Sequence, residues 1–300
     1  MFGKLGFIGA GKMGGAVARR LATGGFEVHV HDLDPAAVQR CVDAGAVAAG
    51  SASAAVKDAE VVFTSLPMPE HVLTTWTRLA PELAEGASAV DVSTIDPGTV
   101  EQAAAAVGEY GHPFVTCALG KTPAAAEDGA IPLFVGGPGE AVSALRPLFE
   151  RIGETTHEFE SAGAAAMFKL ISNLIGMTNV AVLAEGYVLA RAAGITPEQF
   201  SAALADTGAS SFQSQVRLPW LVAGDFEARF GVELAAKDVR LALDAGARQG
   251  IASPVAAQGL AQLLSAIAHG HGGEDAVAVA KVLDPQGRLL GSAGNETADE

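Results

Sequence analysis

The chain has 300 residues, of which 49% are hydrophobic, and its formal net charge is −15 at pH 7. This length predicts one large or two ordinary domains, with ample apolar content for a core. The acidic balance excludes a nucleic-acid partner, and two cysteines and seven ungrouped histidines give no reason to expect a disulfide framework or a metal site.

The N-terminal segment predicts a strand, a tight turn and a helix. A short apolar run at residues 5–8 is followed by Gly9, Gly11 and Gly14, after which apolar residues recur at helical spacing. The glycine spacing matches the dinucleotide fingerprint, in which a helix N-terminus faces the pyrophosphate. Strand and fingerprint together leave no room for a signal peptide, so we expect a cytoplasmic protein.

The second predicted strand ends at Asp32. A carboxylate at this position accepts hydrogen bonds from the adenine ribose and repels a 2′-phosphate. An NADP site would favour an arginine directly behind it, but Leu33 and Asp34 stand there. We therefore expect NAD to be preferred over NADP, although NADP use stays open.

Strand-like runs and Ala-rich helical segments alternate up to about residue 160. The further runs are 61–66, 89–92, 114–117 and 133–137, with helices such as 35–44 and 97–110 between them. Alternation of this kind predicts an α/β domain of the Rossmann type, with a parallel, doubly wound sheet, over residues 1–161.

The pattern then changes to helices. Residues 162–193 contain no proline and predict one long apolar interdomain helix, and residues 194–300 predict an all-α substrate and dimerisation domain. A helix that is apolar nearly all round is expected between subunits or domains, so we expect a homodimer or homotetramer. Charges, Gly and Asn interrupt the apolar stretches, so no membrane span is predicted. The tail at 287–300 is expected to fray.

The long helix carries a candidate catalytic pair. In GAAAMFKLISN, Lys169 and Asn173 are four residues apart and share one helix face. Such a pair can protonate and hold a carbonyl oxygen, with the lysine as general acid in reduction and general base in oxidation. A solvated surface lysine is the alternative, but a lysine among so many apolar neighbours needs a partner or a purpose.

Five segments together resemble the β-hydroxyacid dehydrogenase family. In chain order they are GFIGAGKMGGAVARRL, SLPMPEHV, DVSTIDPGTV, GAAAMFKLISN and KDVRLALDAG, and they cover almost the whole chain. The resemblance implies an NAD(P)-dependent dehydrogenase or reductase that acts on CH–OH groups. It places the family's proton-transferring lysine on Lys169 and its orienting asparagine on Asn173.

The fingerprint and the resemblance together give two sets of expected binding residues. The cofactor is expected at Gly9, Gly11, Lys12, Met13, Gly14, Asp32, Leu66, Pro67, Thr94 and Lys237. The substrate is expected at Ser93, Gly120, Lys121, Thr122, Lys169, Asn173, Lys237 and Asp238. By the resemblance, Lys237 and Asp238 close the site over the cofactor. No metal ligand is expected.

One segment departs from the family pattern. Members that act on simple hydroxy acids usually carry S-G-G after the fifth strand, where this chain has Gly120, Lys121 and Thr122. The departure is similar to the G-R-T-S segment of sulfolactaldehyde reductases, with lysine in place of arginine. A cation and a hydroxyl suit a sulfonate or phosphonate, so we expect a small anionic hydroxy or oxo substrate of that kind.

Other readings remain open. They are a hydroxycarboxylate dehydrogenase of the 3-hydroxyisobutyrate or tartronate semialdehyde type, an imine reductase, and a non-catalytic NAD-binding sensor. Lys169 counts against the imine reductase, and the joint presence of Lys169, Asn173 and Lys237 counts against the sensor. Lys121 is alternatively a solvent-exposed loop lysine.

Overall fold

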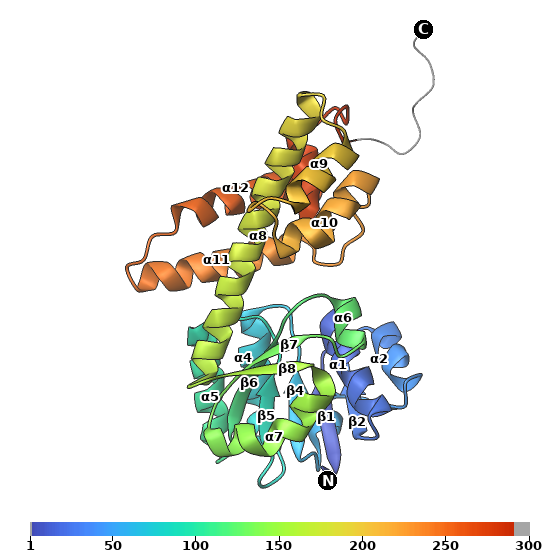
Figure 1. Cartoon of the computed structure of the whole chain (residues 1–300). Helices are drawn as coiled ribbons and strands as arrows, with labels where there is room; N and C mark the ends of the chain where they lie inside the picture. Colours follow the sequence, from blue (N-terminus) through green and yellow to red (C-terminus); the bar gives the residue numbers. More distant parts are fainter. Residues whose placement is uncertain (1, 291–300) are drawn as a thin grey trace. The chain divides into compact units, whose positions relative to one another are not determined.

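The computed structural model describes residues 2–290 and divides the chain into two compact units, Met1–Leu170 and Ile171–Glu300. Figure 1 labels elements of both units where there is room. Most of the tail that the sequence predicts to fray, residues 291–300, lies outside the described residues.

The first unit is built on one eight-stranded sheet. Its strands are β1 (Lys4–Ile8), β2 (Glu27–His31), β3 (Val47–Ala48), β4 (Val61–Thr64), β5 (Ser88–Asp91), β6 (Phe114–Leu119), β7 (Pro132–Gly136) and β8 (Thr155–Phe159). They lie in the order β3-β2-β1-β4-β5-β6-β7-β8. The predicted Rossmann-type, doubly wound domain is confirmed.

The sheet differs from the prediction at one edge, because β7 runs antiparallel to β6. A parallel return needs a crossover with a full helix, whereas the β6–β7 connection carries only the five-residue helix α6 (Pro123–Glu127). Strand β8, which pairs in parallel with β7, was not predicted. Its sequence TTHEF is polar and mostly exposed, as is usual for the last strand of a sheet.

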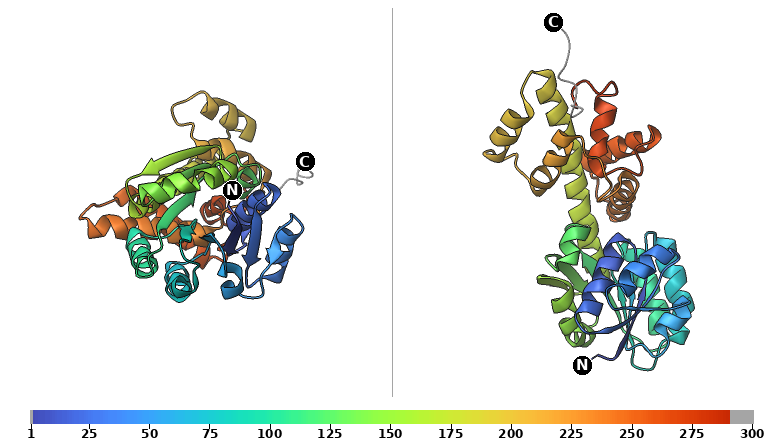
Figure 2. Two further views of the ribbon diagram at one scale, coloured as in Figure 1. Left: turned by 90° about the horizontal axis from the view of Figure 1, so that it is seen from below. Right: turned by 90° about the vertical axis from the view of Figure 1, so that its right-hand side faces the viewer.

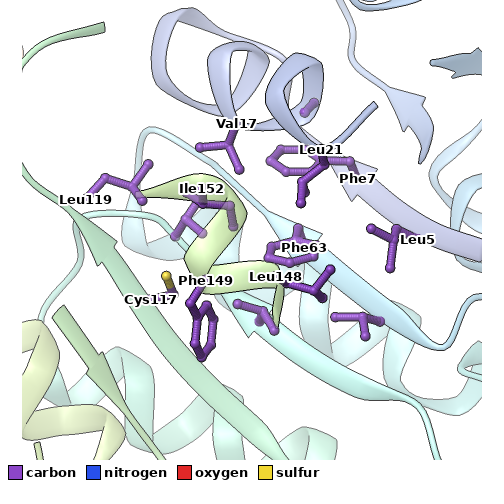
Figure 3. Packing of buried hydrophobic residues seen from close by; sticks show 14 of the residues in the cluster. Leu5, Phe7, Val17, Leu21, Phe63, Cys117, Leu119, Leu148, Phe149 and Ile152 are labelled. Atoms are coloured by element: carbon purple, nitrogen blue, oxygen red, sulfur yellow. The ribbon is translucent and has the colours of Figure 1, made fainter. Parts of the chain in front are cut away.

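Helices cover both faces of this sheet (Figures 1 and 2). They are α1 (Lys12–Thr23), α2 (Pro35–Val42), α3 (Ala52–Val56), α4 (Pro69–Leu79), α5 (Pro97–Gly108) and α7 (Gly139–Ile152), with a 3₁₀ turn at Ala80–Glu82. Successive strand residues point to opposite faces: Phe7 packs with α1 and α7, whereas Ile8 packs with α4 and α5. Figure 3 shows Phe7 and Phe63, whose rings stack at 5.5 Å, among the leucines of the first of these two cores.

The second unit is helical throughout its described residues, apart from one isolated bridge between Gly231 and Asp275. Helix α8 (Ala162–Ala192) starts in the first unit and continues into the second. The others are α9 (Pro197–Ala205), α10 (Phe212–Ala223), α11 (Val232–Arg248), α12 (Pro254–Ala268), a 3₁₀ turn at Ala276–Ala278 and α13 (Val279–Leu283). The predicted all-α domain after a long helix is thus confirmed. Helix α10 contains Pro219 in its interior, a residue type that is unfavourable there.

Helix α8 departs from the sequence expectation on membrane spans. With 31 residues and a mean hydropathy of 1.5 over its most apolar window, it is long and apolar enough to cross a membrane by length and composition. Of this window 39% is buried, and Met177, Val180 and Tyr187 belong to the core of the second unit. A core helix of this kind meets the same criterion as a membrane span.

Candidate active site

Most of the expected site residues of the first unit lie at one edge of its sheet. Gly9 directly follows β1, Asp32 follows β2 and Gly120 follows β6, while Leu66 and Ser93 stand two residues beyond the ends of β4 and β5. The carboxyl ends of parallel strands share one edge, which is where doubly wound sheets bind ligands. The fold therefore brings these segments together as expected.

The glycine-rich loop has the geometry of a phosphate cradle. Gly9 has a φ of +94°, and a Cβ at this position would lie 2.1 Å from the carbonyl oxygen of Ser65. At Gly14 a Cβ would lie 2.3 Å from the carbonyl oxygen of Gly9, whereas at Gly11 it would meet nothing within 4 Å. The loop is thus packed against backbone at Gly9 and Gly14, whereas the space beside Gly11 is open.

Helix α1 opens directly from this cradle. Gly11 is its N-cap and offers no side-chain hydrogen bond, and the first turn contains no acidic residue. The first backbone N–H groups, at and after Lys12 and Met13, are therefore suited to an anion. The residues present fit the pyrophosphate of a dinucleotide.

Asp32 fastens this loop to the end of β2. Its Oδ2 accepts a hydrogen bond from the backbone N–H of Ala10 at 2.5 Å, and its Oδ1 accepts one from Asp34 at 2.8 Å. The neighbouring Leu33 is 94% exposed. Arg40, on the following helix, lies 4.0 Å from the carboxylate of Asp34. Two backbone donors thus orient a carboxylate that still has acceptor capacity.

Ser93, which the sequence analysis expects to bind the substrate, is buried. Its side chain is 4% exposed, donates to Oδ1 of Asp91 at 2.7 Å, and accepts from the backbone N–H of Leu66 at 2.9 Å. Thr94, the next residue, is half-buried. The sequence analysis did not single out Asp91, although an acidic residue that directly follows two buried strand residues is a signal worth attention.

The segment Gly120–Lys121–Thr122 has an unexpected internal arrangement. Lys121 has a φ of +59°, in the left-handed region that favours glycine. Its ammonium lies 2.5 Å from Oε1 of Glu154 and 2.7 Å from the carbonyl oxygen of Ala130. Thr122 is the N-cap of α6, and its hydroxyl accepts from the N–H of Ala125. Nothing in the sequence pointed to Glu154, which is a surface residue.

Lys169 and Asn173 lie one turn apart on α8, as predicted, and both are half-buried. The start of this helix is held by aromatic contacts within the first unit. The ring of Phe168 lies 4.8 Å from that of Phe134 on β7 and 5.1 Å from that of Phe159 on β8. These contacts fix the backbone beside Lys169 against the sheet.

In the second unit, three expected site residues form one cluster. Nδ2 of Asn173 donates to Oδ2 of Asp238 at 2.6 Å. Nζ of Lys237 lies 2.9 Å from Oδ1 of the same carboxylate. Asp238 is 2% exposed, and a buried carboxylate needs polar or charged partners. Asn173 and Lys237 supply them, and both are residues that the sequence analysis had named.

Comparison with known proteins gives the chain a family. Residues 4–163 match the NAD binding domain of 6-phosphogluconate dehydrogenase, and residues 163–283 match the NAD-binding domain of NADP-dependent 3-hydroxyisobutyrate dehydrogenase. The 3-hydroxyisobutyrate dehydrogenase of Pseudomonas aeruginosa is 30% identical over 79% of this chain and 83% of its own. The 3-sulfolactaldehyde reductase of Escherichia coli is 29% identical over 90% and 92%.

Among solved structures, the fold is similar to that of a 3-hydroxyisobutyrate dehydrogenase from Mycobacterium tuberculosis. The TM-score is 0.86 at 24% identity, with 94% of this chain and 99% of that chain covered. Two matched family models together span residues 4–283 and agree with the five sequence segments and the dinucleotide cradle. The chain therefore belongs to the β-hydroxyacid dehydrogenase family and is an NAD(P)-dependent oxidoreductase that acts on hydroxy groups.

Proposed function

We propose that the protein transfers a hydride between NAD(H) and a small anionic hydroxy or oxo substrate, with Lys169 as general acid and base. One observation carries this proposal: Asn173, one turn from Lys169 on α8, is held by the buried carboxylate of Asp238. A helix that presents an ammonium beside a fixed amide offers two groups for one substrate oxygen.

In this proposal each residue has a definite task. Nζ of Lys169 gives a proton to the carbonyl oxygen in reduction and removes it from the hydroxyl in oxidation. Asn173 donates an amide hydrogen to Asp238, which fixes the orientation of the amide that is proposed to hold the substrate oxygen. The nicotinamide, when bound, supplies or accepts the hydride.

Preference for NAD over NADP is supported by Asp32. Its carboxylate is oriented by the N–H groups of Ala10 and Asp34, and a negative charge there repels a 2′-phosphate. The nearest arginine along the chain, Arg40, stands beside the carboxylate of Asp34. Comparison of NADH and NADPH affinities tests the preference, and tighter binding of NADPH would contradict it.

A sulfonate or phosphonate substrate is supported by Lys121 and Thr122. They follow β6 at the ligand-binding edge of the sheet, and Lys121 adopts a backbone conformation that costs a lysine more than a glycine. Two hydrogen bonds occupy part of the ammonium, which has three donors. A hydroxycarboxylate substrate is the second candidate, since the similar proteins include a 3-hydroxyisobutyrate dehydrogenase.

An activity panel tests both the reaction and the substrate. NADH oxidation is followed with a three-carbon sulfonate aldehyde, its phosphonate analogue, tartronate semialdehyde and a cyclic imine, with Lys169→Met as the matched inactive variant. Lysine-dependent turnover of the sulfonate or phosphonate is expected. Preference for tartronate semialdehyde would indicate a hydroxycarboxylate substrate. Turnover of the imine alone, or of no compound in the panel, would contradict the proposed reaction.

The proposal includes assembly as a homodimer or homotetramer, in the cytoplasm. In the second unit, Val182 and Leu189 on α8 and Val255 on α12 are more than half exposed. Val182 and Leu189 are seven residues apart and therefore share one face of α8, and exposed apolar side chains on one helix face suit a contact with a second copy of the chain. Light scattering measures the assembly, and Val182→Lys together with Leu189→Lys should dissociate it; a monomeric parent protein would contradict the proposed assembly.

The cytoplasmic location is supported by the two buried free thiols, Cys41 and Cys117, which suit a reducing compartment.

A further inference from the structure

A buried set of hydrogen bonds links the ends of β4 and β5. Thr64 and Asp91, the last residues of these strands, are paired in register and have no exposed surface. The hydroxyl of Thr64 donates to Oδ1 of Asp91 at 2.6 Å, and the hydroxyl of Ser93 donates to the same oxygen at 2.7 Å. Ser93 in turn accepts the backbone N–H of Leu66 at 2.9 Å.

The direction of these bonds decides what Ser93 does. A serine hydroxyl has a single hydrogen, and here Asp91 receives it. Toward Leu66 the oxygen is therefore an acceptor, and the almost complete burial of Ser93 keeps it from acting as a donor elsewhere. The side chain transmits the position of the Asp91 carboxylate to the backbone at Leu66.

The backbone at Leu66 forms one wall of the phosphate cradle. Ser65 donates its N–H to the carbonyl oxygen of Ile8 at 2.9 Å. A Cβ on Gly14 would lie 2.6 Å from Cβ of Ser65, and one on Gly9 would lie 3.3 Å from Cδ2 of Leu66. With so little clearance, a shift of a few tenths of an ångström at residues 65–66 moves the glycine loop as well.

We propose that Asp91 and Ser93 are positioning residues for the dinucleotide. Together they hold Leu66, and through it the wall of the glycine loop, in the geometry that binds the cofactor. Ser93 acts on cofactor affinity through Leu66 and makes no direct substrate contact, in contrast to the expectation from the sequence. The inference rests on the nucleotide binding shared by the family and is independent of the proposed substrate.

The test measures cofactor affinity in the absence of substrate. Ser93→Ala is titrated with whichever of NADH and NADPH the parent protein binds more tightly, by nicotinamide fluorescence. Removing the acceptor of a buried N–H should weaken binding about 5- to 50-fold. Asp91→Asn should weaken binding as well, and the double variant should be no weaker than the worse single one, because both act on Leu66.

Thr116→Val is the matched control. Thr116 is buried on β6 beside Asp91 in register, and its hydroxyl makes no hydrogen bond within the described part of the chain. The cofactor affinity of Thr116→Val should stay within about twofold of the parent value, because the substitution removes no hydrogen bond to Leu66. Thermal unfolding confirms that each variant is folded at the titration temperature.

The outcomes separate the alternatives. Weakened cofactor binding in Ser93→Ala, with Thr116→Val near the parent value, supports the proposal. Unchanged cofactor affinity in Ser93→Ala with a raised KM for the substrate would overturn it, because Ser93 would then be a substrate ligand. Equal weakening in Thr116→Val would overturn it too, because the effect would be general damage to the core.

Discussion

Asn173 and Asp238, 65 positions apart in the sequence, are joined by a 2.6 Å hydrogen bond from Nδ2 to Oδ2. The carboxylate is buried, and Nζ of Lys237 lies 2.9 Å from its other oxygen. Since a carboxylate accepts but does not donate, this contact fixes which end of the amide faces Asp238. The orientation of Asn173 on α8 is thus set by α11.

We expect Asp238→Ala and Asn173→Ala to impair the same step. Each should lower kcat by about 10- to 100-fold with little change in NADH affinity, and the double variant should resemble the worse single one. Steady-state kinetics on the best substrate of the panel measures this. Asp244 is an exposed carboxylate on α11, the helix that carries Asp238, so Asp244→Asn is the control and should behave as the parent protein. Fully additive losses would show that the two residues act separately.

Lys169→Met should remove the proton-transfer group while preserving most of the length of the side chain. Methionine and lysine have similar helix propensities, so the substitution should be tolerated within α8. We expect kcat to fall by about 10²-fold or more, with NADH binding nearly intact. A variant with near-normal kcat would remove Lys169 from the mechanism.

The sequence predicted the architecture well because its signals are local. Gly9 needs its left-handed backbone and Gly14 its small size, and such needs are visible as spacing alone. The antiparallel direction of β7 could not be predicted, because the direction of a strand depends on how its connection packs. Strand β8 could not be predicted because its sequence is polar. Alternation of apolar residues says nothing about direction.

The sequence analysis named candidate site residues, but it did not show the contacts that these residues make. Lys121 and Ser93 were expected to meet the substrate, and nothing in the sequence showed that Glu154 and Asp91 are their partners. Such pairs join residues on different elements, and a single sequence does not reveal their distances. Asn173 and Asp238 were both named, but their hydrogen bond was not foreseen.

The two thiols should be inert in the native protein. Burial raises the pKa of Cys117, with the charge of Asp91 adding to it, and burial also raises the pKa of Cys41 despite the nearby Arg19. Because the thiolate is the reactive form, a disulfide reagent at pH 8 should label neither cysteine until the chain unfolds. Rapid labelling of the native protein would contradict this.

The same pKa shifts predict how stability depends on pH. In the unfolded chain a thiol ionises near its ordinary pKa of 9.0, whereas burial in the folded protein raises the pKa of both thiols above that value. The unfolded state therefore binds fewer protons above that pH, and the free energy of unfolding should fall as the pH rises beyond it. Urea unfolding at pH 8 and pH 10 measures the fall, and Cys117→Ala should reduce it.

The ion pair between Lys121 and Glu154 gives opposite expectations for its two members. If the ammonium binds the substrate anion, Lys121→Ala should lower kcat/KM about 10- to 150-fold through loss of a charge-assisted hydrogen bond. The loss should fall mainly in KM, since the anion keeps its charge throughout the reaction. An uncharged substrate analogue should be nearly indifferent to the change.

Glu154→Gln should act in the other direction. In the free enzyme Glu154 accepts a hydrogen bond from the ammonium that the substrate anion needs, so the carboxylate competes with the anion. Replacing it with a neutral amide should lower KM for the anionic substrate by about two- to fivefold, the scale of an exposed ion pair. Glu158→Gln removes the same charge from β8, where Glu158 pairs with Arg146, and should leave KM unchanged.

Equal effects of Glu154→Gln and Glu158→Gln on KM would indicate a general change in surface charge. If KM for every anion is the same in Lys121→Ala, Glu154→Gln and the parent protein, Lys121 only holds its own loop and the sulfonate or phosphonate assignment is wrong.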